Sequence, residues 1–170
     1  MEQCKKGDIK SHELLYNRYC QAMYHTALRI VTDRHHAEDI LQEAFFEAFT
    51  RLNTLKNPGA FAGWLKQIVI HKSINFINRT KVTWLNIEIT GVHDIQDEEK
   101  ISEQDFVEKI DAIRMAITAL PVKYRAIVNL HIFEKMGFEE IAVMMEMPSA
   151  TVRSQYLRAR QKILAIISKQ

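Results

Sequence analysis

The chain has 170 residues, a formal charge of only +2 at pH 7, and a composition that is 47% hydrophobic and poor in Gly and Pro, which favours helices. It is long enough to bury one medium core or two small ones. No apolar run approaches membrane-spanning length and the start, MEQCKKGDIKSHE, is too polar for a signal peptide, so we expect a cytoplasmic protein without membrane insertion.

Three helices are predicted in the first domain, residues 1–80, because apolar residues recur there at helical spacing. In the first helix these residues are Leu14, Leu15, Tyr19, Met23, Ala27, Leu28 and Val31. The second helix is expected from about His36 to Leu52 and the third from about Phe61 to Asn78. The loop TLKNPG, punctuated by Pro and Gly, separates them.

An acidic linker is predicted over residues 81–104. The helical period is lost there, and residues 80–108 carry 2 Lys/Arg against 8 Asp/Glu, whereas the blocks on either side are net basic. The segment VTWLNIEIT alternates like a strand, but one short strand is not stable alone. We therefore expect a mostly extended connection.

The second domain, residues 105–170, is predicted to begin with two helices. Ser102 is a candidate cap for the first of them. Pro121 suits the first position of the second helix, Val122–Phe133, and Gly137 ends this pair.

A helix-turn-helix is predicted to follow. A short helix, Phe138–Glu146, is separated by a tight turn from a long helix, Ala150–Ile167, for which Ser149 is a candidate N-cap. Small and apolar residues, Ala142 among them, can close the space between the two helices. The predicted fold is therefore all-α, with two small helical domains joined by an acidic linker.

The long last helix has two unlike faces when its residues are placed 100° apart. One face holds Val152, Tyr156, Ala159, Ile163 and Ile166. The other holds Arg153, Ser154, Leu157, Arg158 and Gln161, with no acid to pair with the cations. Such side chains suit a DNA major groove. The alternative is a solvated basic helix end, but cations in a first helical turn are disfavoured by the helix dipole.

Two surfaces of the first domain also carry candidate contacts. On the second helix, Asp39, Gln42, Glu43, Phe46 and Thr50 lie opposite the apolar stripe. An outward Phe among acids favours a protein partner, although Phe46 could instead pack on another helix of the same domain. On the third helix, a strip of Trp64, Gln67, His71, Asn75 and Asn78 favours unstacked bases, with a simple core role as the alternative for Trp64.

The chain shows no motif of an enzyme. It has no nucleophile–base pattern, no phosphate-cradling Gly loop and no HExxH. Cys4 and Cys20 are not spaced as a metal or redox motif, and the neighbouring pair His35 and His36 faces different ways. We expect neither a metal nor a cofactor.

Together these segments resemble the extracytoplasmic-function group of bacterial RNA polymerase sigma factors over nearly the whole chain. AEDILQEAFFEAF is similar to the group's core-polymerase-binding helix, and FAGWLKQIVIHKSINFINR to its helix for the downstream (−10) promoter element. LPVKYRAIVNLHIFEKMGFEEIAVMMEMPSATVRSQYLRAR is similar to its domain for the upstream (−35) element. The group usually has Asn in place of His71 and often Asp in place of Asn75.

The resemblance implies a role for each matching position. Core RNA polymerase would be bound by Asp39, Gln42, Glu43 and Phe46. The −10 element would be bound by Asn57, in a loop that captures a flipped base, and by Trp64, Gln67, His71, Asn75 and Arg79. The −35 element would be bound by Arg125, through phosphate, and by Thr151, Arg153, Ser154, Leu157 and Arg158.

The implied function is that of a sigma factor, a non-enzymatic subunit that directs RNA polymerase to promoter DNA for transcription initiation. Such factors are commonly held inactive by an anti-sigma factor. The alternative is a conventional helix-turn-helix transcription regulator with an N-terminal sensing domain. The face with Asp39, Gln42 and Phe46 separates the two, because only a sigma factor must bind core polymerase through it.

Overall fold

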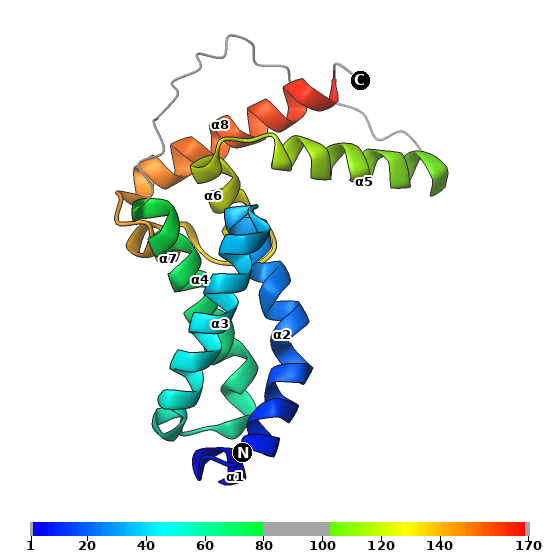
Figure 1. The fold of residues 1–170 in the computed structure, drawn as a ribbon. Coiled ribbons are helices and arrows are strands. Elements are labelled where there is room, and N and C mark those ends of the chain that lie inside the picture. The colour runs from blue at the N-terminus through cyan, green and yellow to red at the C-terminus, as the bar shows by residue number, and fades with distance from the viewer. Residues whose placement is uncertain (1, 80–102, 169–170) are drawn as a thin grey trace. The chain divides into compact units, whose positions relative to one another are not determined.

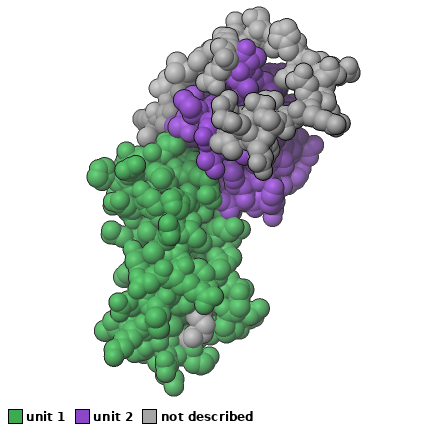
Figure 2. Space-filling model, turned by 90° about the vertical axis from the view of Figure 1, so that its right-hand side faces the viewer, with its two compact units in different colours: residues 1–81 green, residues 82–170 purple. Residues whose placement is uncertain are grey.

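The computed structural model describes residues 2–79 and 103–168, and the chain divides into two compact units, residues 1–81 and 82–170 (Figures 1 and 2). Every regular element in the described ranges is a helix, which confirms the predicted all-α class. The predicted acidic linker lies outside these ranges, except that Glu103 and Gln104 already belong to a helix. None of the described helices is both long and apolar enough to cross a membrane.

Unit 1 is built on three long helices that pack against one another (Figure 1). In chain order its elements are α1 (Glu2–Lys5), α2 (Ile9–Val31), α3 (Arg34–Thr50), the 3-10 turns η1 (Leu52–Thr54) and η2 (Pro58–Ala60), and α4 (Phe61–Arg79). Asp8 and Asp33 cap α2 and α3, each accepting a backbone N–H three residues on, at 2.9 Å. The cap at Asp33 places the start of α3 two residues before the predicted start at His36.

The core of unit 1 follows the predicted apolar stripes. The apolar stripe of α3 and η1 is buried throughout, and it consists of Leu41, Ala44, Phe45, Ala48 and Leu52. Alanines with no exposed surface, such as Ala27 and Ala44, allow the three helices to approach closely. The prediction that Leu14 belongs to this stripe is wrong, because its side chain is 71% exposed near the start of α2.

The short helix α1 is fixed to the rest of unit 1 through Cys4 and Lys5. The Cys4 side chain is only 4% exposed, and its carbonyl oxygen lies 2.9 Å from His12 Nε2. The Lys5 ammonium donates to the carbonyl oxygen of Leu55, at 3.0 Å. The His12 ring stacks on Phe49, with centroids 4.3 Å apart. Helix α1 is therefore attached to α2 and to the segment after η1.

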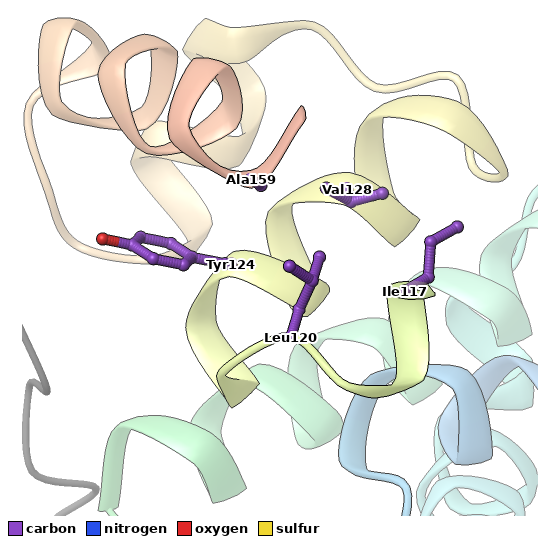
Figure 3. Close-up of a cluster of buried hydrophobic side chains, with 5 residues drawn as sticks. All are labelled: Ile117, Leu120, Tyr124, Val128 and Ala159. Carbon is purple, nitrogen blue, oxygen red and sulfur yellow. The ribbon is translucent and has the colours of Figure 1, made fainter. Parts of the chain in front are cut away.

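Unit 2 contains α5 (Glu103–Thr118), α6 (Val122–Ile132), α7 (Phe138–Met144) and α8 (Ser149–Ile167). Its buried centre is formed by Ile117, Leu120, Tyr124, Val128 and Ala159, which come from α5, the following turn, α6 and α8 (Figure 3). Tyr156 and Ile163 of α8 pack against this cluster. The face of α8 that was predicted to be buried therefore does face the core.

Three residues at helix starts in unit 2 have roles that differ from those predicted. Pro121 and Pro148 are N-caps with extended backbone, so Pro121 is not the first residue of α6, and Ser149 begins α8 instead of capping it. Gly137 does not end a unit but caps α7, and its N–H donates to the Glu140 carboxylate at 2.8 Å. The chain turns from α7 to α8 through Glu146, whose φ is 52°.

Candidate nucleic-acid interface

Helices α7 and α8 form the predicted helix-turn-helix. Ala142 is buried, as are Ile141, Met145 and Val152, which lie on the two helices and the turn between them. These buried side chains fix α8 against α7, so the opposite side of α8 is presented as a defined surface.

That exposed surface carries most of the residues predicted to contact the −35 element. Arg153, Ser154 and Arg158 are exposed, Leu157 is 56% exposed, and Thr151 is partly buried beside them. The Ser154 hydroxyl donates to the carbonyl oxygen of Thr151 at 2.9 Å, which leaves its oxygen free to accept. Cations, a hydroxyl and an apolar side chain thus share one face of one helix.

Arg153 has an acidic partner that the sequence did not indicate. Its Nη2 donates to Glu139 Oε1, from the first turn of α7. The guanidinium also lies over the Phe138 ring, 5.8 Å from its centroid. The hydrogen bond from Arg153 lowers the pKa of the Glu139 carboxyl. The expectation that no acid pairs with these cations is therefore wrong for Arg153.

The Phe138 ring is held in place by two other rings. His131 stacks on it with centroids 4.4 Å apart, and Tyr156 lies 5.3 Å away at a tilt. The His131 ring is itself fixed, because its Nδ1 lies 2.9 Å from the Met136 carbonyl oxygen. Arg153 therefore rests on a packed aromatic group that spans α6, α7 and α8.

The structure contradicts a phosphate contact at Arg125. This side chain is 6% exposed, and its Nη1 donates to the carbonyl oxygens of Thr118 and Leu120 at 2.9 and 3.0 Å. Burial lowers the pKa of its guanidinium. These carbonyls lie at the end of α5 and in the turn after it, so Arg125 caps the C-terminal end of α5 from inside unit 2.

A groove of about 400 Å³ runs beside α4 in unit 1. Four of the six residues predicted to bind the −10 element line it: Trp64, Gln67, His71 and Asn75. Asn57 and Arg79 are not part of this lining. The Asn57 side chain instead accepts the Gly59 N–H at 2.9 Å and caps η2. Trp64 is partly buried, so its ring can both support the groove and offer a face to it.

The other wall of the groove was not predicted from the sequence. Glu47 of α3 and Arg51, the residue after α3, form it together with Lys72 and Ile68 of α4. Lys72 Nζ lies 3.3 Å from a Glu43 oxygen and 3.2 Å from a Glu47 oxygen, and Arg51 donates to Glu47 at 2.6 Å. Burial raises the pKa of Glu47, but hydrogen bonds from Arg51 and Lys72 leave it lowered overall.

The Glu47–Arg51 pair could have been found from its i,i+4 spacing. The Lys72 contacts could not, because they depend on how α3 and α4 cross. Since the two cations that border the groove are engaged by carboxylates, the groove itself is a mixed polar and aromatic surface.

The outward face of α3 is exposed as predicted. Asp39, Gln42 and Glu43 are solvent-accessible, and Phe46 is 76% exposed. The alternative in which Phe46 packs inside the domain is therefore wrong. A large aromatic side chain at this exposure, among acids, is typical of a protein-binding surface.

No candidate metal centre accompanies these surfaces: within the described part of the chain, no three His, Cys, Asp or Glu side chains are grouped to hold an ion. The pair His35 and His36 does not form one. His36 instead lies against Asp33, with Nδ1 3.1 Å from its carboxylate, and its ring is 4.3 Å from the Phe76 ring.

Comparison with known proteins gives matches in both units. The family model Sigma-70 region 2 matches residues 15–83, and Sigma-70, region 4 matches residues 110–163. The chain is 31% identical to the RNA polymerase sigma-H factor of Pseudomonas aeruginosa, over 96% of this chain and 89% of that one. It is 27% identical to the ECF RNA polymerase sigma factor SigW of Bacillus subtilis, over 96% and 92%.

A solved structure shares the fold. It is the sigma factor RpoE in complex with the anti-sigma factor NepR from Bartonella quintana, with a TM-score of 0.51 and 17% identity, covering 94% of this chain and 98% of that one. At this identity the likeness concerns the fold alone.

Proposed function

Since the chain belongs to the extracytoplasmic-function group of sigma-70 RNA polymerase sigma factors, we propose that each of its three exposed surfaces binds a different partner during promoter recognition. The face of α3 binds core RNA polymerase, the groove beside α4 holds the −10 element, and the outward face of α8 reads the −35 element. A conventional regulator with a sensing domain does not account for sigma-70 matches in both units.

Exposure of the α8 face is the observation that carries the proposal. Four neighbouring side chains, Arg153, Ser154, Leu157 and Arg158, are all exposed on a helix whose other face is buried. A helix held in this way can enter a major groove without rearranging its unit. Arginines then reach guanine edges or phosphates, and Leu157 can contact a thymine methyl.

The groove beside α4 supports binding of an unpaired strand. Trp64 provides an aromatic face, and the side chains of Gln67, His71 and Asn75 provide hydrogen-bonding groups along one line. Stacking on an aromatic side chain contributes about 1–3 kcal/mol per base, and this offsets the cost of removing a base from the duplex. The roles of Asn57 and Arg79, which do not line this groove, rest on the family resemblance.

The α3 face supports binding of core polymerase through Phe46 and its acidic surroundings. A Phe that is already exposed can be buried in a partner pocket, while Asp39 and Glu43 pair with basic residues around it. The RpoE structure contains an anti-sigma factor, and we extend this partner class to the present chain. In this proposal the protein works in the cytoplasm with polymerase and catalyses no reaction of its own.

Run-off transcription tests the proposal directly. Core RNA polymerase is combined with the full chain on a library of promoter fragments in which the −35 and −10 elements are randomised. We expect transcripts only when the chain is present, from fragments that share two elements at a fixed spacing. Equal transcription with and without the chain would contradict the proposal, as would enrichment of a single element.

A further inference from the structure

The Glu139–Arg153 ion pair links α7 to α8 on the exposed side of the helix-turn-helix. Its two side chains are 67% and 58% exposed, and the residues are 14 positions apart in the chain. Exposed ion pairs of this kind contribute little to folding stability. The main physical effect of the pair is therefore on where the Arg153 side chain points.

Arg153 is held from two directions by groups that are themselves fixed. Glu139 accepts its Nη2 N–H, and the Phe138 ring lies beneath the guanidinium. Phe138 cannot turn freely, because His131 and Tyr156 pack on it. These contacts favour one orientation of a long side chain that otherwise samples many rotamers.

The pair also biases what Arg153 can bind. Guanidinium has five N–H donors, and the bond to Glu139 leaves others available. A DNA phosphate brought to the same place would be repelled by the Glu139 carboxylate, whereas the neutral O6 and N7 of a guanine would not. The acid therefore favours a base edge over the backbone as the partner of Arg153.

We propose that Glu139 is a positioning residue, which holds Arg153 ready to read one base pair of the −35 element. This inference rests on the proposed function of α8. Glu139 orders the Arg153 side chain before DNA binds. Removing the Glu139 carboxylate therefore lowers the discrimination between bases at that base pair, while the discrimination at other base pairs of the element is unchanged. Arg158 is independent of Glu139 in this respect, because Glu139 pairs with Arg153 on α8.

The test uses holoenzyme reconstituted from core polymerase and the full chain, with promoter fragments randomised in the −35 element. Sequences that are bound and transcribed are counted for the wild type and for Glu139→Gln, Glu146→Gln, Arg153→Ala and the double variant Arg153→Ala/Glu139→Gln. Glu146 is an exposed acid in the turn after α7, so Glu146→Gln removes the same charge without touching Arg153.

We expect Glu139→Gln to reduce discrimination about fivefold or more at one base pair, the same one that Arg153→Ala affects. Glu146→Gln should leave the base preferences unchanged, and Glu139→Gln should have no further effect once Arg153 is Ala. A merely structural role would instead weaken all positions together. Thermal melts of each variant show whether the fold is retained.

Three results would overturn the inference, and they are distinguishable. If Arg153→Ala changes one position but Glu139→Gln gives the same profile as Glu146→Gln, Glu139 has no positioning role. If Arg153→Ala changes nothing, the assignment of Arg153 to a base is wrong. If the wild-type holoenzyme enriches no sequence, the proposed function of α8 fails, and the inference fails with it.

Discussion

At the scale of single residues, the arginines of unit 2 have different surroundings and therefore different expected roles. Arg125 is enclosed and donates to main-chain carbonyls, Arg153 is held by a carboxylate and a ring, and Arg158 is exposed. Formal charge alone does not separate these cases. Burial and hydrogen-bond partners do.

For Arg158 we expect loss of base-specific binding. Arg158→Ala in the holoenzyme should cost about 1–3 kcal/mol at one base pair of the −35 element and relax the preference there. Arg160→Ala removes the same charge from another exposed position of α8, and should weaken binding evenly across sequences. The measurement is competition binding on a set of single-base promoter variants. If both substitutions weaken binding equally across all promoter variants, Arg158 contacts phosphate and not a base.

For Arg125 we expect loss of stability instead of loss of recognition. Arg125→Ala leaves a cavity and removes the donor to the Thr118 and Leu120 carbonyls, so unit 2 should lose about 3 kcal/mol of unfolding free energy. Urea unfolding followed by circular dichroism measures this, with Arg160→Ala as the exposed comparison. Unchanged stability with impaired promoter binding would restore a role in DNA contact.

At the scale of elements, helix α3 contributes to the core of unit 1, to the groove beside α4 and to an exposed surface. Its buried stripe packs on α2 and α4, and its outward face carries Gln42 and Phe46. On one margin Glu47 lines the groove, together with Arg51, which follows the helix. Substitutions on the outward face should therefore change binding without disturbing the core.

We expect Gln42→Ala combined with Phe46→Ala to abolish association with core polymerase while the helical content and melting temperature stay near those of the wild type. The reason is that both side chains are exposed and add little to the core. Co-purification with tagged core polymerase measures the loss, and Glu38→Ala, an exposed position of the same helix outside the predicted contact set, should bind normally. Normal binding of core polymerase by the double variant would show that this face of α3 is not the polymerase-binding surface.

The N-cap of α3 should make unit 1 sensitive to acid. The backbone hydrogen bond from His36 lowers the pKa of the Asp33 carboxyl, although desolvation acts in the opposite direction. A lowered pKa means that the cap stabilises the fold above the ordinary carboxyl range, and that this contribution is lost as pH falls through the folded-state value. Asp33→Ala should therefore lower the melting temperature at neutral pH, and less so near about pH 3.

Asp33→Asn provides the comparison for this effect, because Asn keeps the cap but cannot titrate. Its melting temperature should lie close to that of the wild type at neutral pH. A difference between Asp33→Ala and the wild type that stays constant from neutral to acidic pH would show that the charge of the cap is unimportant.

Periodicity in the sequence was sufficient to predict the existence and type of the long helices, because each one buries a regular apolar stripe. It predicted the starts of α4, α6 and α7, but it placed those of α3 and α8 too late. At α8 the pair Pro148 and Ser149 offers two possible caps. Leu14 fits the periodicity, yet its side chain is 71% exposed.

Contacts between distant residues were also beyond the sequence. The Arg153–Glu139 pair depends on the angle between α7 and α8, and the Lys72 contacts depend on the crossing of α3 and α4. The family resemblance implies a phosphate contact for Arg125, and only the positions of two carbonyls show that its guanidinium is used inside unit 2. The sequence thus predicted which face of each helix is exposed. It did not predict which residues of other helices the side chains on that face contact.

At the scale of the whole molecule, each unit has its own buried core, so each should fold alone. We expect fragments of residues 1–81 and 103–170 to be helical and to melt cooperatively. Mixed with core polymerase, the two fragments should direct far less transcription than the intact chain, because the covalent connection supplies a high effective concentration for the second contact. Circular dichroism and run-off transcription measure the two properties. Full activity of the mixture would show that the connection is dispensable.

The attachment of α1 gives the protein a built-in reporter. The Cys4 thiol is enclosed while the Cys20 thiol is partly accessible, and neither is in a disulfide. An alkylating reagent should therefore modify Cys20 promptly and Cys4 only when α1 detaches from His12 and Leu55. The ratio of the two labelling rates, read by mass spectrometry, reports how often this end of unit 1 opens, and repeating the measurement with polymerase or DNA bound would show whether either ligand holds it closed.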